Sequence, residues 1–276
     1  MSSADQYVLG YRHQEQERLQ QQAKDLAHES QSLFDRIGIA AGASVVEIGC
    51  GPQGCLELLS ACVGPAGHVV GVERSEDAVR MARGLIEERA LTNVDVLCRD
   101  ARSTGLPRDA FDLATSRLVL VNVPDPRAIA AKAVALVKPG GYLAFHEADW
   151  IAHVCDPPLD AWTKLVDLFV AYSESAGIDP FVGRKTPRLL REAGLLDVGS
   201  NAFVHVYPHG HTRHNILADF VDNLSDRLLT GEFVSARELA ELKAALRRHL
   251  DDPGTLVVSH VYIQAWGRKP LEKSTA

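Results

Sequence analysis

The sequence predicts an α/β fold, a doubly wound and mostly parallel sheet of seven strands with an N-terminal helix and a helical lid. Between residues 41 and 150, short β-branched runs such as Ser44–Ile48 alternate with helical segments, which is typical of a parallel sheet. Right-handed crossovers then place helices on both faces. After Trp150 longer helical segments dominate, and these predict the lid.

A segment rich in Gln and Glu precedes the first strand. Apolar residues recur at the helical period between positions 14 and 37, and Gly38 follows as a residue suited to end a helix. We expect one amphipathic helix within an N-terminal segment of residues 1–40. Its apolar stripe must pack on the following domain or on another subunit, so a homodimer is one expectation.

The predicted core of the fold covers residues 41–150. Ser75 is a typical N-cap, with Glu76 and Asp77 favourable in the first helical turn behind it. Pro126 begins a later helix, and the Lys-Pro-Gly-Gly run at 138–141 breaks it. The expected strands are 44–48, 68–73, 94–98, 111–120 and 142–147, and the expected helices are 55–63, 75–88 and 126–137.

Residues 151–276 are expected to complete the sheet and to supply the lid. Two strands, 203–207 and 256–266, belong to sheet segments near 186–210 and 255–268, together with a helix at 186–193. The lid is expected as two inserted segments near 156–178 and 212–250, with helices at 159–175, 214–229 and 235–250.

Charge and composition exclude several classes of protein. A net charge of −7 argues against broad attraction to nucleic acid or anionic membranes. The five cysteines are scattered and form no CxxC pair, which predicts reduced thiols. The first 20 residues lack the apolar core of a signal peptide, and no apolar run approaches the length of a membrane span. We therefore expect a cytoplasmic protein without nucleic-acid or membrane partners.

A glycine-rich turn follows the first strand. Gly49, Gly51 and Gly54 lie between a strand and a helix, where the backbone can approach a ligand and helical N–H groups are unpaired. Their spacing also matches the dinucleotide-binding fingerprint, with Glu73 at the distance of a ribose-binding acid. This motif alone leaves an NAD-dependent oxidoreductase and an S-adenosylmethionine site both open.

Two other acidic residues favour S-adenosylmethionine. Glu47, directly before the glycines, would repel a pyrophosphate but attracts the ammonium group of a sulfonium amino acid. Asp100, after the third strand, can accept a hydrogen bond from the adenine amino group. We expect Glu47, Glu73 and Asp100 to line one cleft at the carboxyl ends of consecutive strands.

The motifs EIGCGPQG, GVERS, CRDA, FDLATSRLVLVNVPDP and LVKPGGYLAF follow one another over residues 44–147. In this order the chain resembles the class I S-adenosylmethionine-dependent methyltransferases, which have a Rossmann-like fold, and among them the ubiquinone/menaquinone-biosynthesis type. The resemblance implies S-adenosylmethionine as the cofactor. Gln53 departs from the glycine common there and adds a side chain near the ligand. The implied cofactor-binding residues are Glu47, Gly49, Gly51, Gln53, Glu73, Arg74, Asp100, Ala101 and Arg117.

Polar residues after the fifth strand are the acceptor-side candidates, because ligands of open α/β sheets bind at the carboxyl ends of the strands. Glu147 and His153 are expected to be catalytic, since a base is needed where the acceptor starts protonated. Strand alternation places His146 and Glu147 on opposite faces, so one of them is expected to face the pocket. The expected acceptor contacts are Tyr7, Tyr11, His146, Asp149 and Trp150.

The sequence as a whole predicts methyl transfer to an O, N or C atom of a small molecule, in secondary metabolism or natural-product biosynthesis. A cluster at His205, His209, His211 and His214 has no Cys or Asp at a recognisable ligand spacing, so no metal is expected. The alternatives are the NAD-dependent oxidoreductase and a non-catalytic or repurposed cofactor-binding member, such as a cyclase.

Overall fold

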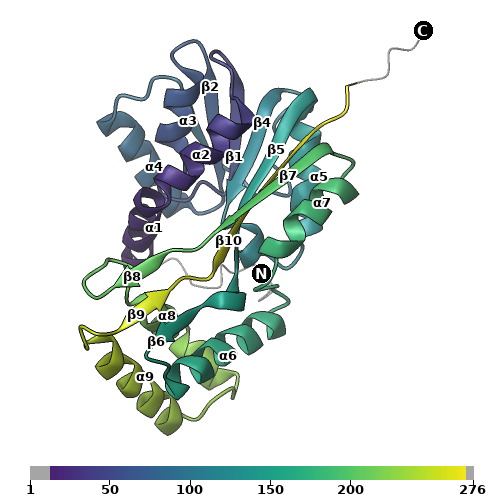
Figure 1. The fold of residues 1–276 in the computed structure, drawn as a ribbon. Helices are drawn as coiled ribbons and strands as arrows, with labels where there is room; N and C mark the ends of the chain where they lie inside the picture. Colours follow the sequence, from purple (N-terminus) through teal and green to yellow (C-terminus); the bar gives the residue numbers. More distant parts are fainter. Residues whose placement is uncertain (1–12, 272–276) are drawn as a thin grey trace.

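The computed structural model describes residues 13–271, and side chains from residue 18 onward. A seven-stranded sheet in the order β3-β2-β1-β4-β5-β10-β7 forms its centre (Figure 1). Within this described sheet β10 runs antiparallel to both of its neighbours, and the other pairings are parallel. This confirms the predicted doubly wound, mostly parallel fold. The strands are β1 Ser44–Ile48, β2 His68–Glu73, β3 Val94–Cys98, β4 Phe111–Arg117, β5 Val137–Asp149, β7 Leu196–Phe203 and β10 Val261–Arg268.

Helices cover both faces because successive strand residues point to opposite sides. Val45 of β1 packs toward α2, α3 and α4, whereas its neighbour Val46 packs toward α5 and α7. Both valines are fully buried. These helices are α2 Ala27–Ile37, α3 Leu56–Val63, α4 Glu76–Glu88, α5 Pro126–Leu136 and α7 Thr186–Glu192.

The N-terminal segment differs from the single helix that was predicted. It forms α1, His13–Asp25, and then α2, with a break at the fully buried Leu26. Gly38 ends α2 in the left-handed conformation, and its N–H donates to Phe34 O, as predicted. The predicted N-cap of α4 is also confirmed, because Ser75 Oγ accepts from Ala78 N. The predicted end of the helix before 138–141 is confirmed, because α5 ends at Leu136. The fifth strand, however, begins at Val137 and not at 142, so this run lies inside β5, next to a register shift against β4.

A second, three-stranded sheet was not predicted. It consists of β6 Val154–Asp156, β9 Leu256–Val258 and β8 Val206–Pro208, all antiparallel, in the order β6-β9-β8. The strands expected at 203–207 and 256–266 are each divided between the two sheets. Ser259 and His205 mark the division, since Ser259 N donates to His205 O and His205 N donates to Ser259 Oγ.

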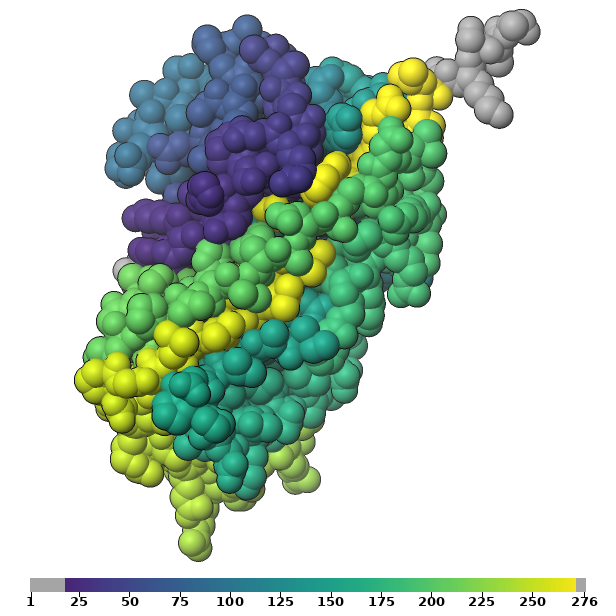
Figure 2. All heavy atoms as spheres, viewed as in Figure 1, coloured from purple at the N-terminus to yellow at the C-terminus, as the bar shows by residue number. Residues whose placement is uncertain are grey.

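Three helices surround a separate apolar core beside the small sheet (Figure 1). We call them the lid helices: α6 Asp160–Ser175, α8 Ile216–Thr230 and α9 Ala236–Leu250. Strand pairing places β10 between β5 and β7. In the space-filling view, the yellow C-terminal strands run beside the green segment of β7 and β8, and the purple N-terminal helices lie against that green segment (Figure 2). Gln264 Nε2 of β10 donates to Glu29 O of α2 at 2.7 Å, which ties α2 to this strand. No helix in residues 13–271 is long and apolar enough to cross a membrane.

Candidate functional site

A cavity of about 840 Å³ opens at the carboxyl ends of the parallel strands. It lies beside β1 and β4, where the strand order reverses, which is the usual ligand position in open α/β sheets. One end borders the glycine-rich turn, and the other borders the lid helices. Its lining includes Glu47, Gly51, Glu73 and Asp100 at the first end and Trp150, Phe169, Arg213, Phe220 and His260 at the second.

The glycines of the turn meet two different requirements, and all three have positive φ. A Cβ on Gly49 would lie 2.5 Å from Val119 Cγ2, and one on Gly54 would lie 2.6 Å from Glu47 Oε2. These two positions therefore need glycine for close packing. A Cβ on Gly51 would meet no atom within 4 Å, so the backbone there is open toward the cavity.

Glu47 borders the cavity and also holds the turn together. It is 1% exposed, and both of its carboxylate oxygens lie 2.9 Å from Cys55 N, which donates to them. Burial raises the pKa of Glu47, and the charge of Arg117 opposes this effect. Arg117 itself donates to Gly54 O and to Ser30 Oγ of α2, both at 2.9 Å. The end of β4 is thereby joined to the turn after β1.

Glu73 and Asp100 stand at the ends of β2 and β3. Glu73 accepts from Gly51 N at 3.1 Å and from Ser75 N at 2.8 Å, so it links the glycine turn to the start of α4. Asp100 accepts from the backbone N and from Nη2 of Arg102, each at 2.7 Å, and hydrogen bonding to Arg102 lowers its pKa. Both acids line the same cavity as Glu47.

These residues fit S-adenosylmethionine on chemical grounds. The open backbone at Gly51 admits a ligand, and the three carboxylates can face an ammonium group, a ribose diol and an exocyclic amine. Arg74, Ala101 and Arg117 also line the cavity, whereas Gln53 does not.

Glu147 does not lie at the cavity surface, which corrects its expected placement. It is fully buried, and its carboxylate accepts from the backbone N–H groups of Val119, Leu120 and Val121 at 2.9–3.2 Å. Burial raises its pKa to about 8, against these hydrogen bonds. Glu147 thus caps the short 3₁₀ turn η2, Leu120–Asn122, after β4.

The histidines expected near the acceptor also lie outside the cavity lining. His153 is 4% exposed, and its ring contacts Trp150 and Trp162 edge-on, with centroids 5.1 and 4.8 Å away. Burial lowers its pKa to about 3. His146 packs edge-on against Phe203 and Tyr262. Strand alternation placed it opposite Glu147, as expected, but both faces are covered by protein.

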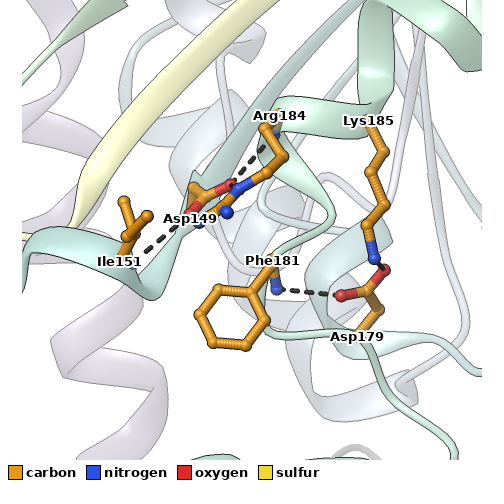
Figure 3. A network of polar contacts seen from close by, with 6 residues as sticks. All are labelled: Asp149, Ile151, Asp179, Phe181, Arg184 and Lys185. Atoms are coloured by element: carbon orange, nitrogen blue, oxygen red, sulfur yellow. Dashed lines mark hydrogen bonds and ion pairs between the residues drawn. The ribbon is translucent and has the colours of Figure 1, made fainter.

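Asp149 forms an ion pair in place of a ligand contact (Figure 3). Its carboxylate accepts from Arg184 Nε at 2.6 Å and from Ile151 N at 3.3 Å. The pair holds the end of β5 against the 3₁₀ turn η4, Gly183–Lys185. Trp150, the next residue along the chain, lines the cavity, whereas Tyr7 and Tyr11 lie outside the described residues.

Several residues at the lid end were missed by the sequence reasoning. His260 is 3% exposed, and its ring stacks on Trp150 at 5.4 Å and 19°. Its position falls within residues 256–266, which the sequence predicted as one continuous strand. Arg213 was hidden in the polar, His-rich loop before α8. No local pattern distinguishes either residue, because their common cavity is formed only by packing. Residues 13–271 contain no group of three or more side chains suited to a metal.

The comparisons with known proteins identify the family of this chain. Residues 39–178 match the methyltransferase-domain family. The chain therefore belongs to that family, and its class is that of the class I S-adenosylmethionine-dependent methyltransferases, as predicted. The class identifies S-adenosylmethionine as the cofactor, which decides against the nicotinamide alternative.

Three similar proteins illustrate the range of the likeness. An uncharacterized 37.1 kDa protein of transposon TN4556 from Streptomyces fradiae is 31% identical over 59% of this chain and 46% of its own length. Demethylmenaquinone methyltransferase of Listeria welshimeri is 25% identical over 60% of this chain and 65% of its own length. The structure of the [4+2]-cyclase SpnF has a TM-score of 0.52 and 19% identity, covering 89% of this chain and 82% of that one. The chain thus spans 46% and 65% of the lengths of these two curated relatives, less than two thirds of each, and SpnF shares the fold.

Proposed function

We propose that this protein transfers the methyl group of S-adenosylmethionine to an O, N or C atom of a small molecule held beneath the lid helices. One observation carries the proposal: a single cavity joins the acid-lined glycine turn to the aromatic side chains of the lid. Its volume lies in the usual range of about 300–1,000 Å³ for small-molecule sites. A role in natural-product biosynthesis is the biological setting that we propose for this reaction.

Most of the expected cofactor residues keep their roles in this proposal. Glu47, Glu73 and Asp100 hold the charged and polar parts of the cofactor, with Gly49 and Gly51 shaping the turn. The remaining proposed contacts are Arg74, Ala101 and Arg117. When bound, S-adenosylmethionine supplies a methyl group on a positively charged sulfur. The protein then has to align the acceptor atom and exclude water, which needs no elaborate catalytic constellation.

His260 takes the place of Glu147 and His153 as the acceptor's polar partner. It is buried in the cavity wall, and burial holds its pKa well below the usual value. The ring is therefore neutral at physiological pH, and one nitrogen has a lone pair that can accept a proton or hydrogen bond from an acceptor hydroxyl or amine.

A matched pair of variants tests the cofactor end. Gly51 and Gly38 both have positive φ and open space at the Cβ position, so Gly51→Ala and Gly38→Ala carry similar backbone strain of about 1 kcal/mol. Gly51→Ala also places a methyl group in the cavity. In calorimetry with S-adenosylhomocysteine, we expect Gly51→Ala to bind about tenfold more weakly and Gly38→Ala to bind normally. Wild-type protein that releases no heat would end the proposal.

Turnover distinguishes the methyltransferase from the repurposed alternative. SpnF, which shares the fold, is described as a cyclase, so the fold leaves that alternative open. Wild-type protein with S-adenosylmethionine and a panel of phenols, amines and carboxylic acids should form S-adenosylhomocysteine and a methylated acceptor, detected by mass spectrometry. Cofactor binding without any methylated product would favour the cyclase-like alternative. The cytoplasmic location, the homodimer and the absence of nucleic-acid partners stay predictions.

A further inference from the structure

The lid end of the cavity has an unusual combination of surfaces. Trp150 and Phe169 stack at 3.9 Å and 22°, and Phe220 lies 5.8 Å and 28° from Phe169 and is tilted by 48° to Trp150. His260 lies on the other side of Trp150, nearly parallel to it. These four rings form one wall of the cavity. A wall of aromatic rings, three of them nearly parallel, suits a flat, aromatic ligand, which can make offset or edge contacts with it.

Arg213 lies in the same part of the cavity and is 6% exposed. Its Nη1 is buried without a hydrogen-bond partner in the described part of the chain. The Cζ atom of Arg213 lies 5.8 Å from the centroid of the Tyr207 ring. No carboxylate within residues 13–271 forms an ion pair with Arg213. Burying a guanidinium without an anion is unfavourable in free energy. A ligand that supplies the anion would remove this penalty and bind more tightly as a result.

Other charged groups surround Arg213. Arg18 of α1, Arg227 of α8 and the acidic Asp226 of α8 line the same region of the cavity. The carboxylates of Asp25 and Glu29, which act on the Tyr207 and His205 rings as Arg213 does, lie outside the cavity lining. Arg18 lies 5.2 Å from the Phe220 ring, so the basic groups adjoin the aromatic wall. The region favours an anion next to a flat ring.

We infer that the methyl acceptor is a planar aromatic molecule carrying an anionic group, with Arg213 as the residue that binds the anion and the stacked rings as the surface that binds the ring. This inference rests on the proposed function. His260, at the junction of the two surfaces, is placed to accept a hydrogen bond from a hydroxyl or amine of the same ring.

Three related probes test the inference by calorimetry in the presence of saturating S-adenosylhomocysteine. The first is 6-hydroxy-2-naphthoate, the second is its neutral carboxamide, and the third is the fully saturated decalin carboxylate. We expect wild-type protein to bind the naphthoate about tenfold or more tightly than either of the others. The carboxamide loses the charge-assisted hydrogen bond, and the decalin carboxylate loses the ring stacking.

Variants then assign the preference to one residue. Arg213→Gln should lose the preference for the naphthoate over the carboxamide. Arg248→Gln removes the same charge from the exposed face of α9, away from the cavity, and should keep the preference. If Arg213→Gln does not fold, as judged by circular dichroism, Arg213→Lys decides: its single ammonium group cannot match the guanidinium fork, so the preference should shrink.

The outcomes separate the inference from the function on which it rests. Equal binding of naphthoate and carboxamide by the wild type would overturn the inference, as would an undiminished preference in folded Arg213→Gln or in Arg213→Lys. Decalin carboxylate that binds as tightly as the naphthoate would overturn its aromatic part. All of these results leave cofactor binding intact, whereas a wild type that does not bind S-adenosylhomocysteine would overturn the proposed function itself.

Discussion

The acidic side chains at the strand ends differ in what they already contact, and this sets what each can contribute. Asp100 is engaged by Arg102, yet a carboxylate has room for further donors, and its side chain is 33% exposed at the cavity. We predict that Asp100→Ala weakens S-adenosylhomocysteine binding by about tenfold through the lost adenine contact. Asp95→Ala changes an exposed acid of β3, the strand that precedes Asp100, outside the cavity, and this variant should bind normally in the same calorimetric titration. Equal affinities in both variants would remove the adenine assignment.

Glu147 illustrates a buried acid whose partners are all backbone groups. Glu147→Ala would leave the N–H groups of Val119, Leu120 and Val121 without their acceptor. We predict a loss of about 2–4 kcal/mol in the free energy of unfolding, measured by urea denaturation. Glu88→Ala, at an exposed position on α4, should change the free energy of unfolding by less than about 0.5 kcal/mol. Lost turnover with unchanged stability would return Glu147 to a catalytic role.

His153 predicts a pH dependence of stability. Its folded-state pKa of about 3 lies below the ordinary 6.5, so between these values the unfolded chain binds a proton that the native ring does not. Stability from this group is complete above pH 6.5 and is lost as pH falls toward 3. Below pH 6.5 the free energy of unfolding falls as the pH is lowered. We predict that His153→Phe reduces the slope of this fall by up to about 1.4 kcal/mol per pH unit. The exposed His28→Phe should leave that slope unchanged, and an unchanged slope in His153→Phe would contradict the assignment.

At the scale of elements, the turn after β5 depends on a link to the turn before α7. Asp149 is buried, whereas Arg184 is 43% exposed, so the ion pair is partly screened. We predict that Arg184→Ala lowers the free energy of unfolding by about 1–2 kcal/mol, because the buried carboxylate keeps only backbone donors. Arg188→Ala removes an exposed pair with Glu192 and should cost less than about 0.5 kcal/mol in the same denaturation experiment. Equal costs in the two variants would show that the link is not important.

Element limits could be predicted wherever a local signal marks them. β1, β2 and β3 match their predicted limits because β-branched runs end at turns, and Ser75 and Gly38 mark helix ends by their own hydrogen bonds. The division between β9 and β10 has no such signal. Residues 256–266 look like one strand, and the chain changes sheets at Ser259 only because both sheets are present to pair with it.

At the scale of the whole molecule, cofactor binding and folding are linked. β9 and β10 run from the small sheet into the large one, so we expect the two parts to unfold together. S-adenosylhomocysteine at about 100 times its Kd should raise the free energy of unfolding by about 2.7 kcal/mol and shift one thermal transition upward in calorimetry. Two transitions, of which the ligand moves only one, would show that the lid helices unfold independently.

The sequence by itself determined the doubly wound sheet, the glycine turn and the three acids at its strand ends, because each depends on neighbouring residues along one strand and one turn. Tertiary structure alone decided which polar residues reach the cavity. Glu147, Asp149 and His153 lie at or just after the carboxyl end of the fifth strand, where such candidates are expected. In the structure their side chains contact backbone N–H groups, Arg184 and aromatic rings, respectively. Arg213 and His260 come from distant segments and meet at the lid end only when the two sheets and the lid helices pack together.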